Sequence, residues 1–438
     1  SLRQKWEELW ENHRPPEKIS TVVTYEPRSA YRWLYSLAGD KGLEAIVREI
    51  AQRAKNQMPL SFEDYLLYFT SRVNRIVNTL DTTELKIVSN LVGNSFDDIS
   101  ELAKRVELSS EWVSKKVSEL QKKMILRKFS RVPFSRIEIQ MFHVGFERMF
   151  GSDNAFDFMK DCPFLYSYRK VVSGDWEALA TLCVPYNSST VSYLNQGMEK
   201  ISKKGFNIHI HQIHSSGVSH CFDYYRTDEG IWDIPWELLT VQLGRIKSDG
   251  LGATIPRVDT PQRKTSMNLQ SLEMNVLDCF RRGIATVSEI RSELRVGQQR
   301  VADTIRELRN AELIQTVWEA HNIGLNEHVF LYEQTPSDSL AIAGWSRRLP
   351  RCIVSFSAKE ELMLLAALPR GGSYGLAASI DEVSPSSRIG ILSPKAYGSW
   401  GFPLHLWDSR YQKWKCPETE IQQWLSSLNS GSRPLQEE

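Results

Sequence analysis

The clearest hydrophobic pattern in the chain lies between Ser109 and Met124. Its apolar positions recur at steps of four, three and four and therefore share one face of a helix, while lysines lie on or beside the opposite face. These apolar positions are Val113, Val117, Leu120 and Met124. Ser109 or Ser110 can cap the helix start. A shorter helix is predicted over Asp97–Val106, and Glu107–Ser110 forms a tight turn between them. Two helices so joined, with a basic second helix, are typical of a helix-turn-helix that enters the DNA major groove.

The elements around this pair complete a first winged unit over residues 80–135. Leu80–Val92 predicts a preceding helix, with its apolar residues facing inward. Ile125–Val132 alternates apolar and basic residues, as expected of a wing strand beside DNA.

Residues 136–214 follow a second pattern that alternates strands with helices. Strands are predicted over 137–146, 166–172 and 207–213, helices over 154–160 and 189–204, and a turn leading into a buried strand over 173–185. The order βαββαβ is that of a ferredoxin-like sandwich.

The second half of the chain repeats the first. Residues 188 positions later match through the helices, as Ile99 with Val287 and Val113 with Val301 show. A second winged helix-turn-helix is thus predicted over 268–325, with Gln298–Ala311 as its recognition helix. The segment 173–185 likewise aligns with 357–369, which predicts a second sandwich over 326–405 without the glycine turn of the first.

The fold class is therefore α+β, with two winged helix-turn-helix domains and two ferredoxin-like sandwich domains in tandem. A helical N-terminal region, 1–79, precedes them; its aromatic residues could bind a protein partner or form ordinary core. Residues 215–267 are expected to be a linker that holds one helix over 232–246, and 406–438 a C-terminal extension.

Composition sets the broad class. The 438 residues carry a net charge of +1, but Lys115–Arg136 holds eight basic residues against Glu119, a local field suited to a polyanion. Six scattered cysteines indicate a reducing compartment and free thiols. No apolar run is long enough to span a membrane and no signal peptide is apparent, so we expect a cytoplasmic protein.

The helix-turn-helix resembles a known family. Leu80-Asp81, Glu84, Ile87, Leu91 and Glu101–Ile125 are similar to the leucine-responsive/AsnC (feast/famine) family of transcription regulators, over about 50 residues. Glu107 stands where members usually have glycine, which would allow a less tight turn. In that family the sandwich domain pairs subunits and binds small effectors such as amino acids. The turn Gly174, Asp175, Trp176 and Glu177 resembles the one near the family's effector pocket, with Glu177 in place of aspartate.

We predict a sequence-specific regulator that binds double-stranded DNA as an intramolecular pseudo-dimer, reading two unlike half-sites. The resemblance implies an amino-acid-like effector, and homo-oligomers remain open; no cofactor and no metal site are expected. The residues expected to contact DNA are Ser109, Ser110, Trp112, Ser114, Lys115, Lys116, Lys122, Arg127, Lys128, Arg131, Gln298, Gln299, Arg300 and Arg306.

Other interpretations stay open. The lysines could be only a solvated face, and the chain could be a scaffold of the transcription machinery. His209 and His211 share one strand face, which is either a metal-binding pair or an exposed polar face. Sirohaem decarboxylases resemble the same family and bind a tetrapyrrole between sandwich domains; Tyr168, Arg169 and the histidines at 209–220 could serve that chemistry. Because no nucleophile–base pair, phosphate loop or HExxH motif is present, we expect a non-enzyme.

Overall fold

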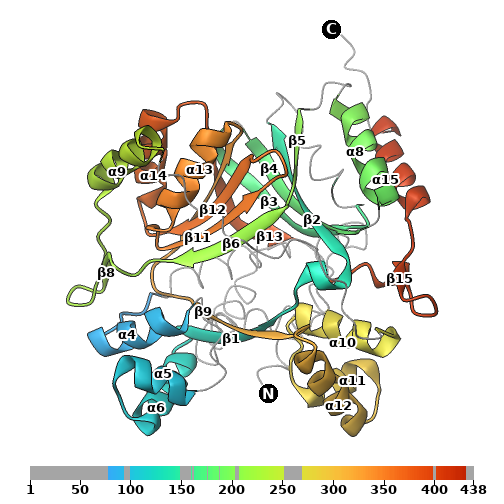
Figure 1. Ribbon diagram of the computed structural model, residues 1–438, viewed down its shortest axis with the longest axis horizontal. Helices are drawn as coiled ribbons and strands as arrows, with labels where there is room; N and C mark the ends of the chain where they lie inside the picture. Colours follow the sequence, from blue (N-terminus) through green and yellow to red (C-terminus); the bar gives the residue numbers. More distant parts are fainter. Residues whose placement is uncertain are drawn as a thin grey trace, which may run out of the picture.

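The computed structural model describes residues 77–92, 99–147, 159, 162–174, 176–186, 188–202, 207–250, 269–397 and 401–430. The expected helical region 1–79 lies outside these ranges except for 77–79, and so does the helix expected over 154–160 except for Met159. Within them the fold is α+β, as predicted: two helical units form one end of the molecule, and a large sheet flanked by helices forms the other (Figure 1). No helix of the described residues is long and apolar enough to cross a membrane.

The first helical unit consists of α4 (Thr82–Leu91), α5 (Ile99–Val106) and α6 (Ser110–Lys122). Asp81 and Glu84 form a capping box at the start of α4, and Ser109 caps α6 by accepting from the Trp112 N–H at 3.3 Å. The predicted apolar stripe is buried in the core of this unit, which includes Ile87, Leu91, Leu102, Val106, Val113, Val117 and Leu120.

The second helical unit repeats the first with α10 (Ser271–Arg281), α11 (Val287–Leu294) and α12 (Gln298–Asn310). Thr286 and Glu289 form a capping box at the start of α11. Val301, Ile305 and Leu308 of α12 are buried, as their counterparts in α6 predict. The repeat read from the sequence is confirmed.

The turn before α6 is tight although Glu107 replaces the glycine usual in the related family. Glu107 adopts the left-handed conformation (φ 59°), and the Leu108 N–H donates to the Ala103 carbonyl at 3.0 Å. Arg295 takes the same conformation (φ 54°) at the corresponding turn. The loosening suggested by the sequence does not occur: each non-glycine residue adopts the strained conformation instead.

The expected wing is replaced by an exchanged ribbon. Strand β1 (Leu126–Arg131) pairs antiparallel with β9 (Gln315–Ala320) of the other helical unit, with Arg127 opposite Glu319 and Lys128 opposite Trp318. Leu126 and Trp318 lie in the core of the first helical unit. Because side chains alternate along a strand, Arg127 and Glu319 point the other way, toward the large sheet. The β1–β9 ribbon thus joins the two helical units to each other and to the sheet above.

The two sandwiches contain the predicted strands and helices, apart from the helix expected over 154–160, which lies outside the described residues except for Met159. The first has η1 (Phe134–Ile137), β2 (Ile139–Glu147), β3 (Leu165–Gly174), β4 (Trp176–Pro185), α8 (Ser188–Ser202) and β5 (Ile208–Gln212). The second has β10 (Glu327–Glu333), α13 (Pro336–Ser346), β11 (Arg351–Phe356), β12 (Leu362–Leu368), α14 (Gly372–Val383) and β13 (Arg388–Tyr397).

The sandwiches pair internally, as expected for a fused dimer. Their strands form one nine-stranded sheet in the order β5-β2-β4-β3-β13-β10-β12-β11-β6, where β6 is Ser215–His220. The edge strands β5 and β6 follow each other in the chain, so the two edges of the sheet meet. Side chains of β4 and β5 contact side chains of β10, although these strands are not neighbours in the sheet. The two halves of the sheet therefore face each other, and we call the region between them the inter-sheet space.

The expected linker is structured over residues 215–250. Beyond β6 it forms the hairpin β7 (Tyr225–Arg226) and β8 (Ile231–Trp232) and then α9 (Trp236–Ser248). The C-terminal extension has the same plan: η2 (Leu404–Leu406), β14 (Trp407–Asp408), β15 (Lys413–Trp414) and α15 (Glu418–Ser430). Trp232 and Pro235 recur at equal spacing as Trp414 and Pro417. The repeat unit is therefore longer than the sequence pattern suggested.

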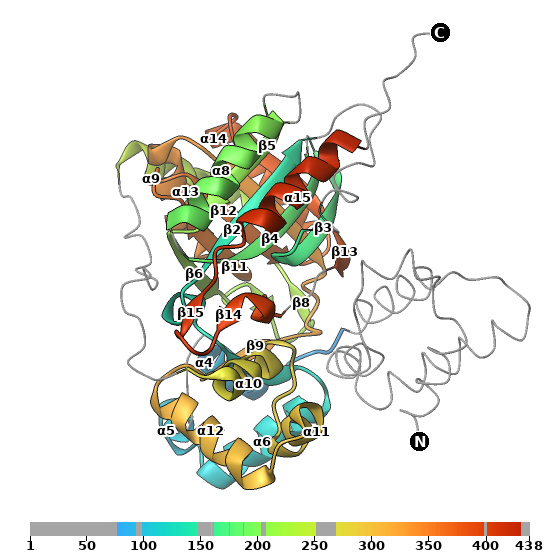
Figure 2. The same cartoon turned by 90° about the vertical axis from the view of Figure 1, so that its right-hand side faces the viewer.

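These additions are exchanged between the two halves. Helix α9 packs on α13 and α14 of the second sandwich, where the Trp345 indole donates to the Leu239 carbonyl at 2.8 Å. Helix α15 packs on α8 of the first sandwich (Figure 2), and the Trp414 indole donates to the Ile137 carbonyl at 2.7 Å. Each half of the chain thus completes the core of the other.

Candidate functional site

Five of the nine histidines in the sequence lie on strand faces that border the inter-sheet space. They come from β2, β5, β6 and β10: His143, His209, His211, His220 and His328. The neighbouring residues on the same strands, such as Phe142 and Ile210, point to the outer cores under the helices. Strict alternation therefore places this set of imidazoles between the two halves of the sheet.

Trp176 forms the aromatic centre of the inter-sheet space. It is fully buried, and its ring centroid lies 5.2 Å from those of Phe330 and His209 and 6.0 Å from that of Tyr332. Gly145 leaves room for the indole, because a Cβ there would overlap the ring. These contacts join β4 of the first sandwich to β10 of the second.

His143 and His211 form a buried stacked pair with ring centroids 6.2 Å apart. His143 Nδ1 lies 3.1 Å from the Thr181 hydroxyl. Burial, and then His211, lowers the pKa of His143 to about 3. Burial lowers the pKa of His211 to about 4, which a contact with the Ser355 backbone only partly opposes. Both rings are therefore neutral near pH 7, the form that can accept a proton or bind a metal ion.

His209 lies in a charged triad with Glu147 and Arg388. Its Nε2 is 2.7 Å from Glu147 Oε1 and 3.3 Å from an Arg388 nitrogen, and Arg388 also pairs with Glu147. The Arg388 guanidinium lies 5.9 Å from the centroid of the Trp176 ring. Burial lowers the pKa of His209, and Glu361 opposes this shift. With Arg388 sharing the Glu147 carboxylate, His209 can lose or gain a proton at modest cost.

A basic cluster lies at the end of the inter-sheet space nearest the β1–β9 ribbon. Arg351 donates to Glu319 of β9 at 2.8 Å, and His321 Nε2 lies 3.3 Å from the same carboxylate. Burial alone would raise the pKa of Glu319, but Arg351, His321 and Arg127 outweigh it and hold the pKa at about 2. The side chains of this ribbon-end cluster are Arg127, Arg169, His220, Glu319, His321, His328 and Arg351.

Two histidines of this cluster, His220 and His328, are also neutral near pH 7. Burial, followed by Arg169 and Arg351, lowers the pKa of His328 to about 3. Burial and Arg351 lower the pKa of His220 to about 4, against an opposing effect of Glu319. Burial and the Arg351 charge also lower the pKa of Arg169. The cations here repel one another, which an anion between them would relieve.

Several buried polar atoms facing this space make no hydrogen bond of good geometry with any described residue. They are Trp176 Nε1, both ring nitrogens of His211 and His220, and Arg351 Nε. A buried unpartnered polar group costs about 1–3 kcal/mol, so a set of them is unusual without a ligand. The donor set matches an anionic aromatic ligand.

The prediction made from the sequence for His209 and His211 needs correction. His209 and His211 do share a face, but it is not exposed, because the second half of the sheet covers it. His211 is fully buried, and of the four histidines at 209–220 only His214 is exposed. Among the described residues no group of three His, Cys, Asp or Glu could hold a metal ion. Tyr168, offered for tetrapyrrole chemistry, is buried in the outer core instead.

The turn predicted as an effector site lies beside this space. Trp176 is its central ring, and Glu177 is half-buried at the start of β4. Gly174 has φ +104° and lies against the Ile389 carbonyl of β13, so it is required where the two sandwiches join. Asp175 lies outside the described residues.

The side chains predicted to bind DNA divide into two sets. On α6, Ser110, Trp112, Ser114, Lys115 and Lys122 are exposed beside the capping Ser109, and Lys128 and Arg131 of β1 are exposed too. Lys116 is half-buried, 3.2 Å from Glu119 and 3.7 Å from Glu84. Arg127 points to the sheet, where burial lowers its pKa, and does not join the helix surface.

On α12 the exposed residues are Gln298, Gln299, Arg300 and Arg306. Gln299 donates to Asp303 at 3.1 Å, and Arg306 pairs with the same carboxylate. Both α6 and α12 lie at the end of the molecule away from the sheet (Figure 1). Of the basic residues named on these helices, Lys116 and Arg306 are paired with neighbouring acids.

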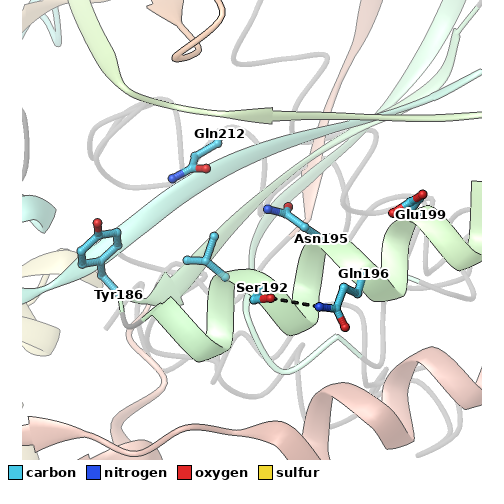
Figure 3. Close-up of a pocket in the computed structure, with 7 residues that line it drawn as sticks. Tyr186, Ser192, Asn195, Gln196, Glu199 and Gln212 are labelled. Atoms are coloured by element: carbon cyan, nitrogen blue, oxygen red, sulfur yellow. Dashed lines mark hydrogen bonds between the residues drawn. The ribbon is translucent and has the colours of Figure 1, made fainter.

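A separate open depression of about 460 Å³ lies on the outer side of β5 (Figure 3). Tyr186, Gln212 and four polar residues of α8 line it, including Ser192, Asn195 and Glu199. Glu199 is its only ionisable acid or base apart from the phenol. This surface lacks the imidazoles and guanidinium groups of the inter-sheet space.

Sequence reasoning missed Glu319, His328, Arg351 and Arg388. A signal was present, since each is a charged residue or histidine at the end of a short apolar strand, as in Arg351–Phe356 (RCIVSF). The sequence cannot show which such residues meet, because they come from β9, β10, β11 and β13.

Fold and site together define a class: an α+β protein of two tandem units, each with a helix-turn-helix and a ferredoxin-like sandwich, and with histidine and arginine side chains between the sandwiches. No protein family and no curated protein matches the sequence. Among solved structures, the chain is similar to the siroheme decarboxylase NirDL, with 14% identity, 79% of this chain and 97% of that chain covered, and a TM-score of 0.34. The chain is also similar to an AsnC family transcriptional regulator from Agrobacterium tumefaciens, with 16% identity, 30% of this chain and 89% of that chain covered, and a TM-score of 0.23. Likenesses this distant do not assign a function.

Proposed function

We propose that the inter-sheet space binds an iron tetrapyrrole with several carboxylate side chains and that the protein decarboxylates it. The observation that carries this proposal is the convergence of five histidines and the arginines 169, 351 and 388 on one enclosed region, with several nitrogens unpartnered. Neither helix surface combines burial with unpartnered donors in this way.

Each part of such a ligand has a matching group. Trp176, Phe330 and Tyr332 pack against one another at the centre of this region, and a flat macrocycle would bind against their rings. The neutral imidazoles of His143 and His211 are of the type that binds haem iron. The guanidinium groups can hold carboxylates by charge-assisted hydrogen bonds.

The proposed reaction needs no external oxidant. The bond between a side-chain methylene carbon and its carboxylate breaks, carbon dioxide leaves, and the remaining electron pair on the methylene carbon takes up one proton. Burial favours this step, because a carboxylate loses more solvation than neutral carbon dioxide does. His209, held by Glu147 at 2.7 Å and partly open to solvent, is the group placed to deliver the proton.

The test uses iron-uroporphyrin III with the full-length protein. We expect a shift of its main absorption band on binding, followed by products that have each lost the mass of carbon dioxide. His209→Gln should leave the absorption shift in place and reduce turnover at least about 100-fold, a typical loss for an acid–base group. His214→Gln, on an exposed histidine near by, is the matched control and should change neither.

The possible results distinguish a failure of ligand binding from a failure of catalysis. Absence of any spectral change with the wild-type protein would refute the binding site. Binding without loss of carbon dioxide, under reducing as well as oxidising conditions, would leave a tetrapyrrole-binding protein and refute the catalytic part.

A second candidate function is double-stranded DNA binding through α6 and α12. The specific observation in its favour is that both helices lie at the same end of the molecule, each with an exposed row of basic or amide side chains (Figure 1). On this view the protein is a regulator and not an enzyme, and the inter-sheet ligand is its effector.

A gel-shift titration in rising salt tests this candidate. Lys115→Glu with Lys122→Glu should weaken binding at least about tenfold at low salt, since two phosphate contacts are lost and reversed. Lys359→Glu, on an exposed lysine of the second sandwich, is the control. Equal binding by both variants and wild type would exclude α6 as a DNA-contacting helix.

A further inference from the structure

The ribbon-end cluster has an imbalance of charge. Among the side chains whose charges act on one another there, three guanidinium groups, Arg127, Arg169 and Arg351, face one carboxylate, Glu319. Arg169 forms no ion pair with any described residue. Buried guanidinium groups are normally paired, so the excess of positive charge is a cost that the folded protein carries.

Arg351 uses only part of its guanidinium group in its ion pair with Glu319, which leaves its Nε–H available to a ligand. One terminal nitrogen donates to Glu319 at 2.8 Å, whereas its Nε is buried without a described partner. His220, directly opposite Arg351 in the β6–β11 pair, also has both ring nitrogens unpartnered. Because these two residues are paired across β6 and β11, their donors lie on the same face of the sheet and can converge on a single anion.

We propose that the ribbon-end cluster is a carboxylate-binding site in which Arg351 is shared between the ligand and Glu319, so that the β1–β9 ribbon senses occupancy. The inference rests on the proposed function, because it takes the ligand to be the polycarboxylate of the inter-sheet space. A ligand carboxylate accepts hydrogen bonds from the Arg351 Nε–H and from the His220 ring, and the positive charge of Arg169 attracts it.

The contact reaches the helical units through adjacent residues of one strand. Glu319 points to the sheet, while its neighbour Trp318 lies in the core of the first helical unit, where it packs with Leu126. When the ligand carboxylate binds Arg351, the ion pair between Arg351 of β11 and Glu319 of β9 weakens. Strand β9 therefore has different restraints in the occupied and empty states, and both helical units are attached to it.

The experiment measures the affinity of full-length variants for iron-uroporphyrin III. Glu319→Gln removes the competing carboxylate and should tighten binding at least about threefold, since a negative charge no longer opposes the anion. Arg351→Gln should weaken binding at least about tenfold, whereas Arg351→Lys should lose less because it keeps the charge. Glu312→Gln is the control: Glu312 pairs with Arg136 at 2.6 Å outside the cluster.

Amide hydrogen exchange gives a second readout that needs no substitution. The ligand should change exchange in residues 126–131 and 315–320 of the wild-type protein, and this response should disappear in Glu319→Gln. Circular dichroism confirms that each variant is folded.

The outcomes distinguish this site from the proposed function. If the wild-type protein binds the probe but all four variants bind equally and the ribbon exchange is unchanged, the shared site is overturned and the proposed function stands. If the wild-type protein does not bind the probe at all, both fail. Tightening by Glu319→Gln together with the loss of the ribbon response supports the inference.

Discussion

The outer faces of α6 and α12 and the ribbon-end cluster both gather positive charge, but the helix faces are open to solvent whereas the cluster is largely enclosed by protein. On the helices Lys116 pairs with Glu119 and with the buried Glu84, and Arg306 pairs with Asp303, while solvent screens the exposed charges around them. Inside, Arg169 and the unpartnered Nε of Arg351 lie among neutral histidines.

This difference shows at which of the two places the binding of an anion would release more free energy. Exposed lysines gain free energy from a polyanion mainly through counterion release, and that gain fades with salt. Buried donors without partners recover both hydrogen bonds and charge stabilisation, because the surrounding dielectric is low. Burial combined with missing partners is thus a stronger indicator of function here than the number of basic residues.

The largest expected effect comes from His211→Leu, which removes two unpartnered buried nitrogens at similar volume. The ligand-free protein should become more stable, by about 1 kcal/mol, because a buried polar group without a partner is replaced by an apolar one. Affinity for iron-uroporphyrin III should fall at least tenfold, since a major imidazole contact is lost. Thermal unfolding and absorption titration measure the two effects.

His143→Leu is the matched comparison, because His143 has a partner in Thr181 at 3.1 Å. Its loss should destabilise the protein by about 1–3 kcal/mol by leaving the Thr181 hydroxyl buried and unpaired. A destabilised His211→Leu protein that binds the ligand normally would mean that the interior imidazoles are structural.

A second effect is expected from pH, which acts on four of these histidines at once. His143, His211, His220 and His328 have folded-state pKa values of about 3 to 4, below the ordinary 6.5. As pH falls below 6.5 the unfolded chain takes up protons first, so stability declines toward pH 4, by about 1.4 kcal/mol per pH unit for each fully buried histidine.

A bound polycarboxylate should raise the pKa values of His220 and His328, which lie beside the proposed carboxylate site, so its binding takes up protons and tightens severalfold between pH 7 and pH 5.5. Isothermal titration in two buffers of different ionisation enthalpy measures the uptake. DNA binding by the exposed lysines should change little over the same range, and an affinity for the ligand that is flat with pH would contradict the anionic site.

The smallest effect concerns the helix surface. Glu107→Gly should stabilise the protein by about 0.5–1 kcal/mol, because Glu107 has φ 59° and glycine adopts this conformation without strain. Denaturant unfolding measures it. Ligand affinity should not change; a destabilised variant would show that the exposed 3.8 Å pair of Lys86 with Glu107 matters more than the strain.

The sequence predicted the helices of both units because their apolar periodicity depends only on local spacing and recurs at Val113 and Val301. It could not predict the partner of β1, since the alternation of Leu126–Arg131 fits a wing and an exchanged ribbon equally well. An alternation with a period of two residues predicts a strand and its two faces, but it does not show which element packs on each face.

The candidate site was predicted only in part for the same reason. Spacing placed His209 and His211 on one face, and the Gly174–Glu177 turn placed Trp176 near a pocket. The covering strand β10, with Phe330 and Tyr332, lies more than a hundred residues away, and so does β11 with Arg351. Such long-range pairing leaves no periodic signal.

The exchange of α9 and α15 between the two halves also has a consequence for synthesis on the ribosome. Helix α15, which covers α8 of the first sandwich, is made only after Glu418–Ser430 leave the tunnel. The strand that pairs with β3, β13, is also made long after β3 itself. The growing chain thus presents an unpaired strand edge while the second half is being made, an interval in which chaperone binding would protect it from aggregation.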